Sequence, residues 1–306
     1  MTVLRRSSTR RGTAYGVGAY LLWGLFPLYW PLLEPADSLE VLAHRVLWSL
    51  LVVGLLLGLT RRTGNLRAVA ADRGLVLRLA VAAVVVALNW GAYIYGVTSN
   101  QVVETSLGYF INPIVTVLLA VLVLGERLRP VQWTALGVAF AAVLVLSVEN
   151  GRPPWIALVL AFSFATYGLI KKTAAVGAVE GLAVETAVLF PVAACYVGYL
   201  TVTGSGTFGT EGPGHAGLLA ASGLITAVPL LLFASAATRV SLTALGVLQY
   251  LAPTLQFLLG VLLFDEPLSS AKLAGFVLVW LALVLFTADL VRHHRRQLRL
   301  AVAVPT

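Results

Sequence analysis

Hydrophobic residues gather along the chain in ten long runs, and short polar segments separate them. A helix needs about 20 apolar residues to cross the roughly 30 Å hydrocarbon core of a bilayer, and each run has about that length. The pattern therefore predicts ten membrane-spanning helices joined by short loops, with ends fixed to within about 2–4 residues. The expected spans are 13–33, 38–59, 75–97, 102–124, 131–148, 155–173, 181–203, 215–238, 242–264 and 270–291.

Charged residues are scarce, because Lys, Arg, Asp and Glu make up 11% of the 306 residues while 59% are hydrophobic. An average soluble domain carries about 25% charged residues, so this chain cannot cover a water-exposed surface. The net charge of +8 does not indicate nucleic acid, since the basic residues lie between or outside the hydrophobic runs. We expect an all-α integral membrane protein with one membrane domain.

The distribution of Lys and Arg predicts the orientation in the membrane. With a cytoplasmic N-terminus, 18 of the 21 basic residues fall on the cytoplasmic side, where the positive-inside rule places them. We therefore expect a multi-pass protein of the plasma (inner) membrane, with a cytoplasmic N-terminal tail over 1–12 and a cytoplasmic C-terminal tail over 292–306. Omitting one span would scramble this distribution.

A short pattern recurs in the second half of the chain. Phe110-Ile111-Asn112-Pro113 with Glu126 thirteen residues later is echoed by Tyr250-Leu251-Ala252-Pro253 with Glu266. Five spans per copy is an odd number, so the second copy enters the membrane from the opposite side. The sequence thus predicts two inverted five-helix repeats, 13–148 and 155–291, which is an architecture typical of secondary transporters.

The segment 106–113 (SLGYFINP), followed by Gly125-Glu126-Arg127, resembles the EamA-type unit of the drug/metabolite transporter superfamily. Ala43-His44-Arg45, Asn89-Trp90 and Gln249-Tyr250 further resemble the RarD family, and the similarity extends over residues 12–297. The resemblance implies a ten-helix inner-membrane permease of the kind labelled by chloramphenicol sensitivity or resistance. The second copy departs from the first at Asp265-Glu266-Pro267, so Glu126 and Glu266 need not share one role.

Arg45 is the most informative polar residue within a span. A charge at the centre of a membrane helix costs about 2.5–3.5 kcal/mol, and Arg45 lies roughly 10 Å below the outer end of its span. Asn89, Tyr93 and Glu104 fall in the same outer half. We expect Arg45 to bind a carboxylate or other anionic group of the solute, with Glu104 as its resting partner; a purely structural Arg45–Glu104 ion pair is an equal alternative.

Other polar residues suggest proton coupling or gating. His44, four residues after Glu40, is a candidate to carry a coupling proton, although a histidine hydrogen-bonded only for stability is the more common situation. Lys171 and Glu185 fall at similar depths near the inner ends of their spans, where they are candidates for an inner gate. Snorkelling of the lysines at a helix end is the competing interpretation, and for Lys172 we favour it.

Prolines within spans indicate a midplane site. Pro113 and Pro253 each free a backbone carbonyl at corresponding positions of the two copies, which is typical of a binding site between inverted repeats but equally of simple helix bends. Glu126 and Glu266 stand at span ends and are interpreted as caps. The expected binding residues near the prolines are Gly108, Tyr109, Asn112, Gln249 and Tyr250.

Several chemistries have no counterpart in the sequence. Phosphate-binding loops, clusters with metal-ligand spacing and nucleophile motifs are missing, so we expect no enzyme, no cofactor and no metal. The expected function is secondary active transport, as an exporter, of a small solute; a non-transporting membrane sensor or assembly factor on the same fold is the alternative. Expected partners are the lipid bilayer and an amino acid, metabolite or amphenicol, with a homodimer left open.

Overall fold

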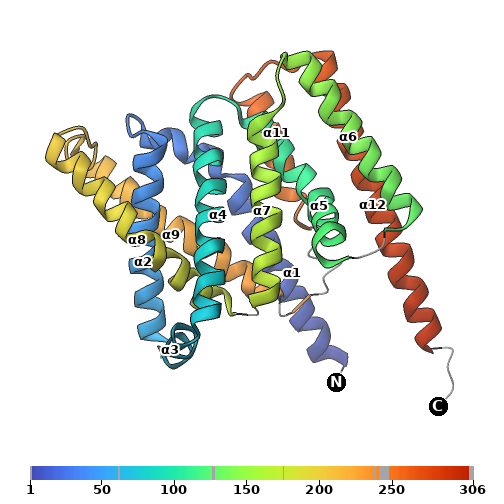
Figure 1. The fold of residues 1–306 in the computed structure, drawn as a ribbon, viewed down its shortest axis with the longest axis horizontal. Coiled ribbons are helices and arrows are strands. Elements are labelled where there is room, and N and C mark those ends of the chain that lie inside the picture. Colours follow the sequence, from blue (N-terminus) through green and yellow to red (C-terminus); the bar gives the residue numbers. More distant parts are fainter. Residues whose placement is uncertain are drawn as a thin grey trace.

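The computed structural model describes residues 2–60, 63–125, 128–174, 176–237, 239–240 and 248–302. All regular elements within these ranges are helical (Figure 1). α1 begins and α12 ends at the same end of the bundle, which we call the terminal end; the opposite end is the distal end (Figure 1). The expected cap Glu126 and the first residues of the expected span 242–264 lie outside the described ranges.

The helices follow the hydrophobic runs closely. In the first half they are α1 Thr2–Gly24, the 3₁₀ turns η1 Phe26–Leu28 and η2 Trp30–Leu33, α2 Ser38–Leu59, α3 Thr63–Ala71, α4 Arg73–Thr98, α5 Val102–Leu124 and α6 Pro130–Asn150. In the second half they are α7 Trp155–Ala174, α8 Ala178–Thr203, α9 Gly212–Ala237, α11 Leu251–Leu262 and α12 Ser270–Val302.

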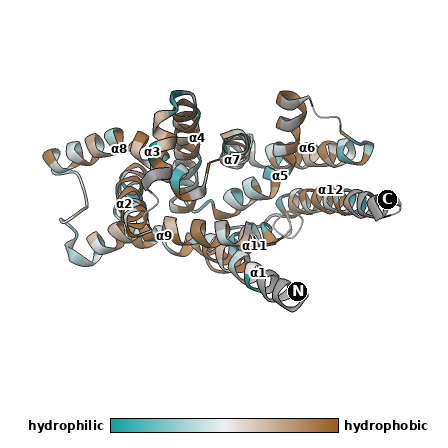
Figure 2. Ribbon diagram, turned by 90° about the horizontal axis from the view of Figure 1, so that it is seen from below, coloured by the Kyte–Doolittle hydropathy of each residue, from teal (hydrophilic) through white to brown (hydrophobic). Residues whose placement is uncertain are grey.

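Within the described ranges, seven helices are long and apolar enough to cross a membrane: α2, α4, α5, α6, α8, α9 and α12. α7 and α11 contain shorter apolar stretches. The helices expose large hydrophobic side chains, among them Leu55 at 61%, Phe140 at 64% and Val284 at 63%, and hydrophobic colours run along most of the bundle in Figure 2. Such a surface suits lipid and not water, which confirms the expected all-α membrane protein.

Three segments differ from the expectation. The first helix ends at Gly24 instead of continuing to residue 33, because Pro27 and Pro31 lack the amide hydrogen that an α-helix needs, and the chain continues in 3₁₀ turns. The connection after α2 contains an additional short helix, α3. Both expected tails are largely helical, since α1 begins at Thr2 and α12 continues to Val302.

Small residues allow the helices to approach one another closely. This is common in membranes, where the hydrophobic effect does not drive helices together and close packing must do so. α2 packs against α8 and α9, and α5 packs against α7 and α11. The tightest approach to the backbone of a neighbouring helix is at Gly223 of α9, where a β-carbon would lie 2.3 Å from the backbone carbonyl carbon of Trp48 in α2. Since backbone cannot rotate away, α2 and α9 would have to separate to accommodate any side chain.

We expect Gly223→Ala to lower the free energy of unfolding by about 1–3 kcal/mol, as overpacking in a close-packed interior does. Gly217→Ala, in the same helix, is the matched control, because no atom lies within 4 Å of a β-carbon there. The control should be neutral or stabilising by up to about 1 kcal/mol through helix propensity. Thermal unfolding in detergent measures both, and equal midpoints for the two variants would contradict the close contact.

Candidate functional site

Arg45 lies inside the bundle, in the half of α2 that faces the distal end. Its side chain is 4% exposed, and Nε donates a 2.8 Å hydrogen bond to Oγ1 of Thr226 in α9. Three aromatic rings surround the guanidinium, whose central carbon lies 4.0 Å from the centroid of Trp90, 5.3 Å from Trp30 and 5.8 Å from Phe26. The charge, which α2 carries, therefore lies in an aromatic cage built by α4 and the two 3₁₀ turns.

The expected partnership of Arg45 with Glu104 is wrong. Glu104 lies 3.6 Å from Nη2 of Arg152 and accepts a 3.0 Å hydrogen bond from the backbone N–H of Ile156. The start of α7 offers free N–H groups and the positive end of a helix dipole, which attract a carboxylate more effectively than a distant arginine does. Among the described residues, Arg45 takes part in no ion pair.

Polar atoms without partners accompany this unpaired charge. Nε1 of Trp30, the hydroxyl of Tyr93 and Oε1 of Gln256 are buried without a hydrogen bond of ordinary geometry. Tyr93 is close enough to Arg45 for the two groups to interact electrostatically, and Gln256 of α11 lies beside Tyr93. A buried polar atom without a partner costs about 1–3 kcal/mol, so this concentration is typical of a place that receives a ligand or water.

Asn89 and Tyr109 join the same group of side chains. The rings of Tyr93 and Tyr109 are 5.6 Å apart, and the hydroxyl of Tyr109 donates to Oδ1 of Asn89 at 3.4 Å. The amide of Asn89 donates to the carbonyl of Leu160 at 3.1 Å and to Oγ of Ser163 at 2.9 Å, which fixes α4 to α7. We call this set the Arg45 cluster, and its members are Arg45, Trp30, Trp90, Tyr93, Asn89, Tyr109, Thr226 and Gln256.

The other residues expected at a midplane site lie elsewhere. A β-carbon on Gly108 would be 2.8 Å from the carbonyl oxygen of Ala157, so Gly108 serves the contact between α5 and α7. Asn112 accepts a 2.9 Å hydrogen bond from Thr116 of its own helix. Thus Tyr109, which is next to Gly108 in sequence, reaches the Arg45 cluster while its two neighbours along the polar stripe do not.

Gln249 and Tyr250 also lie apart from Arg45. Tyr250 packs against a hydrophobic cluster that includes Phe110 and Phe257, and it lies beside Gln249 and Thr287 of α12. The five expected residues therefore do not form one site. Pro113 lies inside α5 and Pro253 lies in the first turn of α11, and neither brings the neighbouring polar side chains together.

Residues that sequence reasoning missed complete the Arg45 cluster. Thr226 and Gln256 are isolated polar residues inside apolar runs, a weak signal that could have selected Gln256, since its amide has four hydrogen-bonding positions to satisfy. Trp30 gave no signal, because aromatic residues are common near the ends of spans.

Lys171 and Glu185 form the expected contact near the terminal end. Nζ of Lys171 lies 2.8 Å from Oε1 of Glu185, and the hydroxyl of Tyr167 donates to Oε2 at 3.1 Å. Glu185 is 1% exposed. Gly181 leaves room for the ammonium, because a β-carbon there would lie 2.1 Å from Nζ. The geometry joins α7 to α8 through a buried ion pair.

The expected hydrogen bond between His44 and Glu40 is not formed. Nδ1 of His44 accepts from Nε1 of Trp48 at 3.3 Å, and Glu40 binds the backbone of Thr207 instead.

Glu266 is a cap, as expected, but it caps a helix of the other half. Its carboxylate accepts hydrogen bonds from the backbone N–H groups of Val102 and Val103 at the start of α5. Burial raises the pKa of the Glu266 carboxyl above its ordinary value, while these N–H groups oppose the rise.

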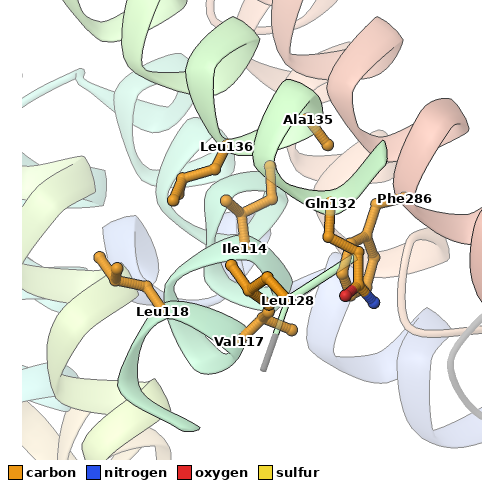
Figure 3. A pocket seen from close by; sticks show the side chains of 8 residues that line it. All are labelled: Ile114, Val117, Leu118, Leu128, Gln132, Ala135, Leu136 and Phe286. Atoms are coloured by element: carbon orange, nitrogen blue, oxygen red, sulfur yellow. The ribbon is translucent and has the colours of Figure 1, made fainter. Parts of the chain in front are cut away.

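A small recess near the terminal end is separate from the Arg45 cluster. α5, α6, α12 and the segment before α6 line it, and Figure 3 shows Gln132 as its one polar side chain. It offers no charged group to a solute. The remaining lining residues are Ile114, Val117, Leu118, Leu128, Ala135, Leu136 and Phe286.

Comparison with known proteins identifies the family. The EamA-like transporter family matches residues 10–148. Protein RarD of Streptomyces exfoliatus is 56% identical over 298 residues, which cover 97% of this chain and 95% of the relative. The uncharacterized transporter YojE of Bacillus subtilis (strain 168) is 40% identical over 297 residues, 95% of this chain and 98% of the relative.

A more distant relative is the chloramphenicol-sensitive protein RarD of Pseudomonas aeruginosa, 33% identical over 293 residues, 94% of this chain and 97% of the relative. A solved crystal structure matches with a TM-score of 0.58 and 21% identity, over 92% of this chain and 98% of that one, which supports the fold alone. The chain belongs to the RarD family of EamA-type permeases, and it is a membrane transporter.

Proposed function

We propose that this protein is a secondary active transporter, working as an exporter, for a small solute that carries an anionic group. The observation that carries the proposal is the guanidinium of Arg45, which is buried and has no anionic partner within the described part of the chain. Desolvating a charge without a partner costs several kcal/mol, which the cation–π contacts offset by about 2 kcal/mol. A carboxylate of the solute, from a metabolite or an amino acid, would complete the site, and Asn89, Tyr93 and Tyr109 would orient it.

The proposed architecture is two inverted five-helix repeats, with α1, α2, α4, α5 and α6 corresponding to α7, α8, α9, α11 and α12. Helix packing supports it, because exchanging each helix for its counterpart maps one contact onto another. α5 with α7 becomes α11 with α1, α4 with α7 becomes α9 with α1, and α2 with α9 becomes α8 with α4. Alternating access would then exchange the conformations of the two halves around a fixed site.

The proposed orientation places the terminal end, and so both termini, in the cytoplasm. α3, which carries Arg67, and the start of α6, next to Arg129, lie at that end (Figure 1), and Arg239 lies against Gly12 of α1. The starts of α7 and α12, close to Arg152 and Lys272, lie at the distal end. The Lys171–Glu185 pair is then the cytoplasmic gate of the route. His44, near the distal end, is the proposed carrier of the coupling proton.

Depletion of loaded vesicles tests the function while the solute is still unidentified. Proteoliposomes are loaded with the small-molecule extract of cells, supplemented with amphenicols and amino acids, and an inwardly directed proton gradient is imposed. Mass spectrometry should show that at least one anionic compound leaves vesicles with the protein faster than protein-free vesicles. The proposal is contradicted if no compound leaves the vesicles or if only cations leave. Absence of any transport would favour the alternative function, a membrane sensor or assembly factor.

A further inference from the structure

A loop at the distal end folds onto a buried carboxylate of α2. Residues 204–211 join α8 to α9, and Glu40, in the first turn of α2, is 2% exposed. Its Oε1 accepts hydrogen bonds from N–H of Thr207 at 2.7 Å, from the Thr207 hydroxyl at 3.0 Å and from N–H of Phe208 at 3.3 Å. One carboxylate oxygen thus holds two consecutive residues of the loop.

Two histidines complete the contact. The ring of Phe208 stacks on His44 with centroids 4.8 Å apart, and Nε2 of His215 in α9 lies 2.9 Å from the Thr207 hydroxyl. Nε2 of His44 is buried without a partner. Glu40 and both histidines stand outside the Arg45 cluster, and nothing in the transport route described above requires His215 or the loop.

The hydrogen bonds define which protonation states this arrangement accepts. Three donors point to Oε1, an arrangement that the carboxylate form of Glu40 satisfies best, since charge-assisted hydrogen bonds are the stronger ones. Nδ1 of His44 accepts from Trp48, so His44 is bound as the neutral ring with its proton on Nε2. The Thr207 hydroxyl donates to Glu40 and therefore accepts from Nε2–H of His215.

Other titratable groups face the loop from two helices. Asp37 caps α2 by accepting from the N–H groups of Leu39 and Glu40, and Tyr196 of α8 lies 3.4 Å from Asp37 Oδ2. Asp37 caps α2 and the Tyr196 hydroxyl is directed to Asp37, so these hydrogen bonds do not involve the loop. This leaves the carboxyl group of Glu40 and the imidazoles of His44 and His215 as the titratable groups in contact with Thr207 and Phe208 of the loop.

We propose that Glu40, His44 and His215 form a proton-binding site that latches the loop 204–211 over α2 and releases it when a proton arrives. A proton on Oε2 of Glu40 removes the negative charge and so weakens the charge-assisted hydrogen bonds by which Oε1 holds Thr207 and Phe208. A proton on Nδ1 of His44 breaks its hydrogen bond from Trp48, and the imidazolium, four residues after Glu40 on the same helix, then competes with the loop for the carboxylate. Acid therefore opens the latch.

The latch and the Arg45 cluster are built on the same two helices. α2 carries Glu40, His44 and Arg45, and α9 carries His215 together with Thr226, the hydrogen-bond partner of Arg45. A movement of the loop that shifts α9 against α2 therefore changes both the latch and the Arg45 cluster. This is a physical route by which proton binding at the distal mouth affects the solute site.

Cysteine labelling tests the latch. In the Cys195→Ala background, which removes the single native cysteine, Leu200→Cys places a thiol beneath the loop, where Leu200 is 7% exposed and faces Gly206. Val202→Cys, two residues away and 89% exposed, corrects for the intrinsic pH dependence of the thiol. In detergent, the ratio of the two maleimide labelling rates should rise about fivefold or more from pH about 8 to about 5.5.

Variants assign the response to the latch. Glu40→Gln and His44→Gln should each flatten the pH response, and Thr207→Val, which keeps every titratable group, should give a high ratio at all pH values. Glu211→Gln, an exposed carboxylate of the same loop, should behave as the native protein. A ratio that stays constant with pH in the native protein, or a response unchanged in Glu40→Gln, overturns the proposal. The readout needs no solute, so failure of the latch and failure of the proposed transport of anions are distinguishable.

Discussion

Replacing Arg45 by methionine should slow transport strongly and at the same time stabilise the protein. Methionine keeps the unbranched stem between the aromatic rings but removes the charge. Without the charge the solute loses a charge-assisted contact worth about 2–5 kcal/mol, so the rate should fall by roughly 30-fold to 5,000-fold. The same change removes an unpaired buried ion, which should raise the free energy of unfolding by about 1–4 kcal/mol.

A loss of transport together with a gain in stability distinguishes a residue that binds the solute from one that is needed for the structure. A residue retained for stability would lose both activity and stability when it is replaced. Arg67→Met, the same chemical change on exposed α3, is the control and should alter unfolding by less than about 0.5 kcal/mol. Depletion of loaded vesicles and thermal unfolding measure the two effects; a destabilised Arg45→Met protein that still transports would contradict the assignment.

Breaking the Lys171–Glu185 pair has the largest expected effect on stability. Glu185→Leu leaves the ammonium of Lys171 without its partner, and Lys171→Met leaves a carboxylate that is 1% exposed. Each single change should lower the free energy of unfolding by about 3–5 kcal/mol. The double variant should recover to within about 1–2 kcal/mol of the native protein, because no uncompensated charge remains.

The proposed gate also predicts how the Lys171→Met, Glu185→Leu double variant behaves in transport. The double variant should fold well yet carry solute without dependence on the proton gradient, because the closure at the terminal end is lost. Arg152→Met is the comparison, since its contact with Glu104 is 3.6 Å and its side chain is 46% exposed; it should cost less than about 1 kcal/mol. Additive single variants, or a double variant with native coupling, would refute the gate.

Local patterns in the sequence predicted the positions of the helices and the importance of Arg45. They did not predict contacts between residues that are far apart in the sequence. Hydropathy located the spans because the bilayer sets their length, and Arg45 stood out because membrane burial makes a charge costly. Depth along a helix places Arg45 and Glu104 at similar heights, but it does not give their directions around the helix axes. Glu104 turned to the start of α7 instead.

Contacts across the chain explain the other differences. Glu40 binds Thr207, 167 residues away, and no local pattern indicates that a loop will supply its hydrogen bonds. Gln256 reaches the Arg45 cluster through the packing of α11 against α1 and α5, whereas Tyr250, from the segment just before the same helix, faces α12. Pro27 and Pro31 follow the end of α1 at Gly24, although the expected span continued to residue 33. Pro113 and Pro253 were a misleading signal for a binding site, since a proline does not decide where neighbouring polar groups point.

Chemical rescue of the charge at position 45 is the most direct test of the central claim. Arg45→Cys in the Cys195→Ala background is treated with an aminoethyl methanethiosulfonate, which attaches an ammonium through a disulfide, or with the neutral methyl reagent, and loaded vesicles are then assayed for depletion. The account predicts that the cationic adduct restores a substantial part of the transport and that the neutral adduct restores none. Equal activity with the two adducts, or full activity of the unmodified variant, would contradict a role for the positive charge of Arg45 in binding the solute.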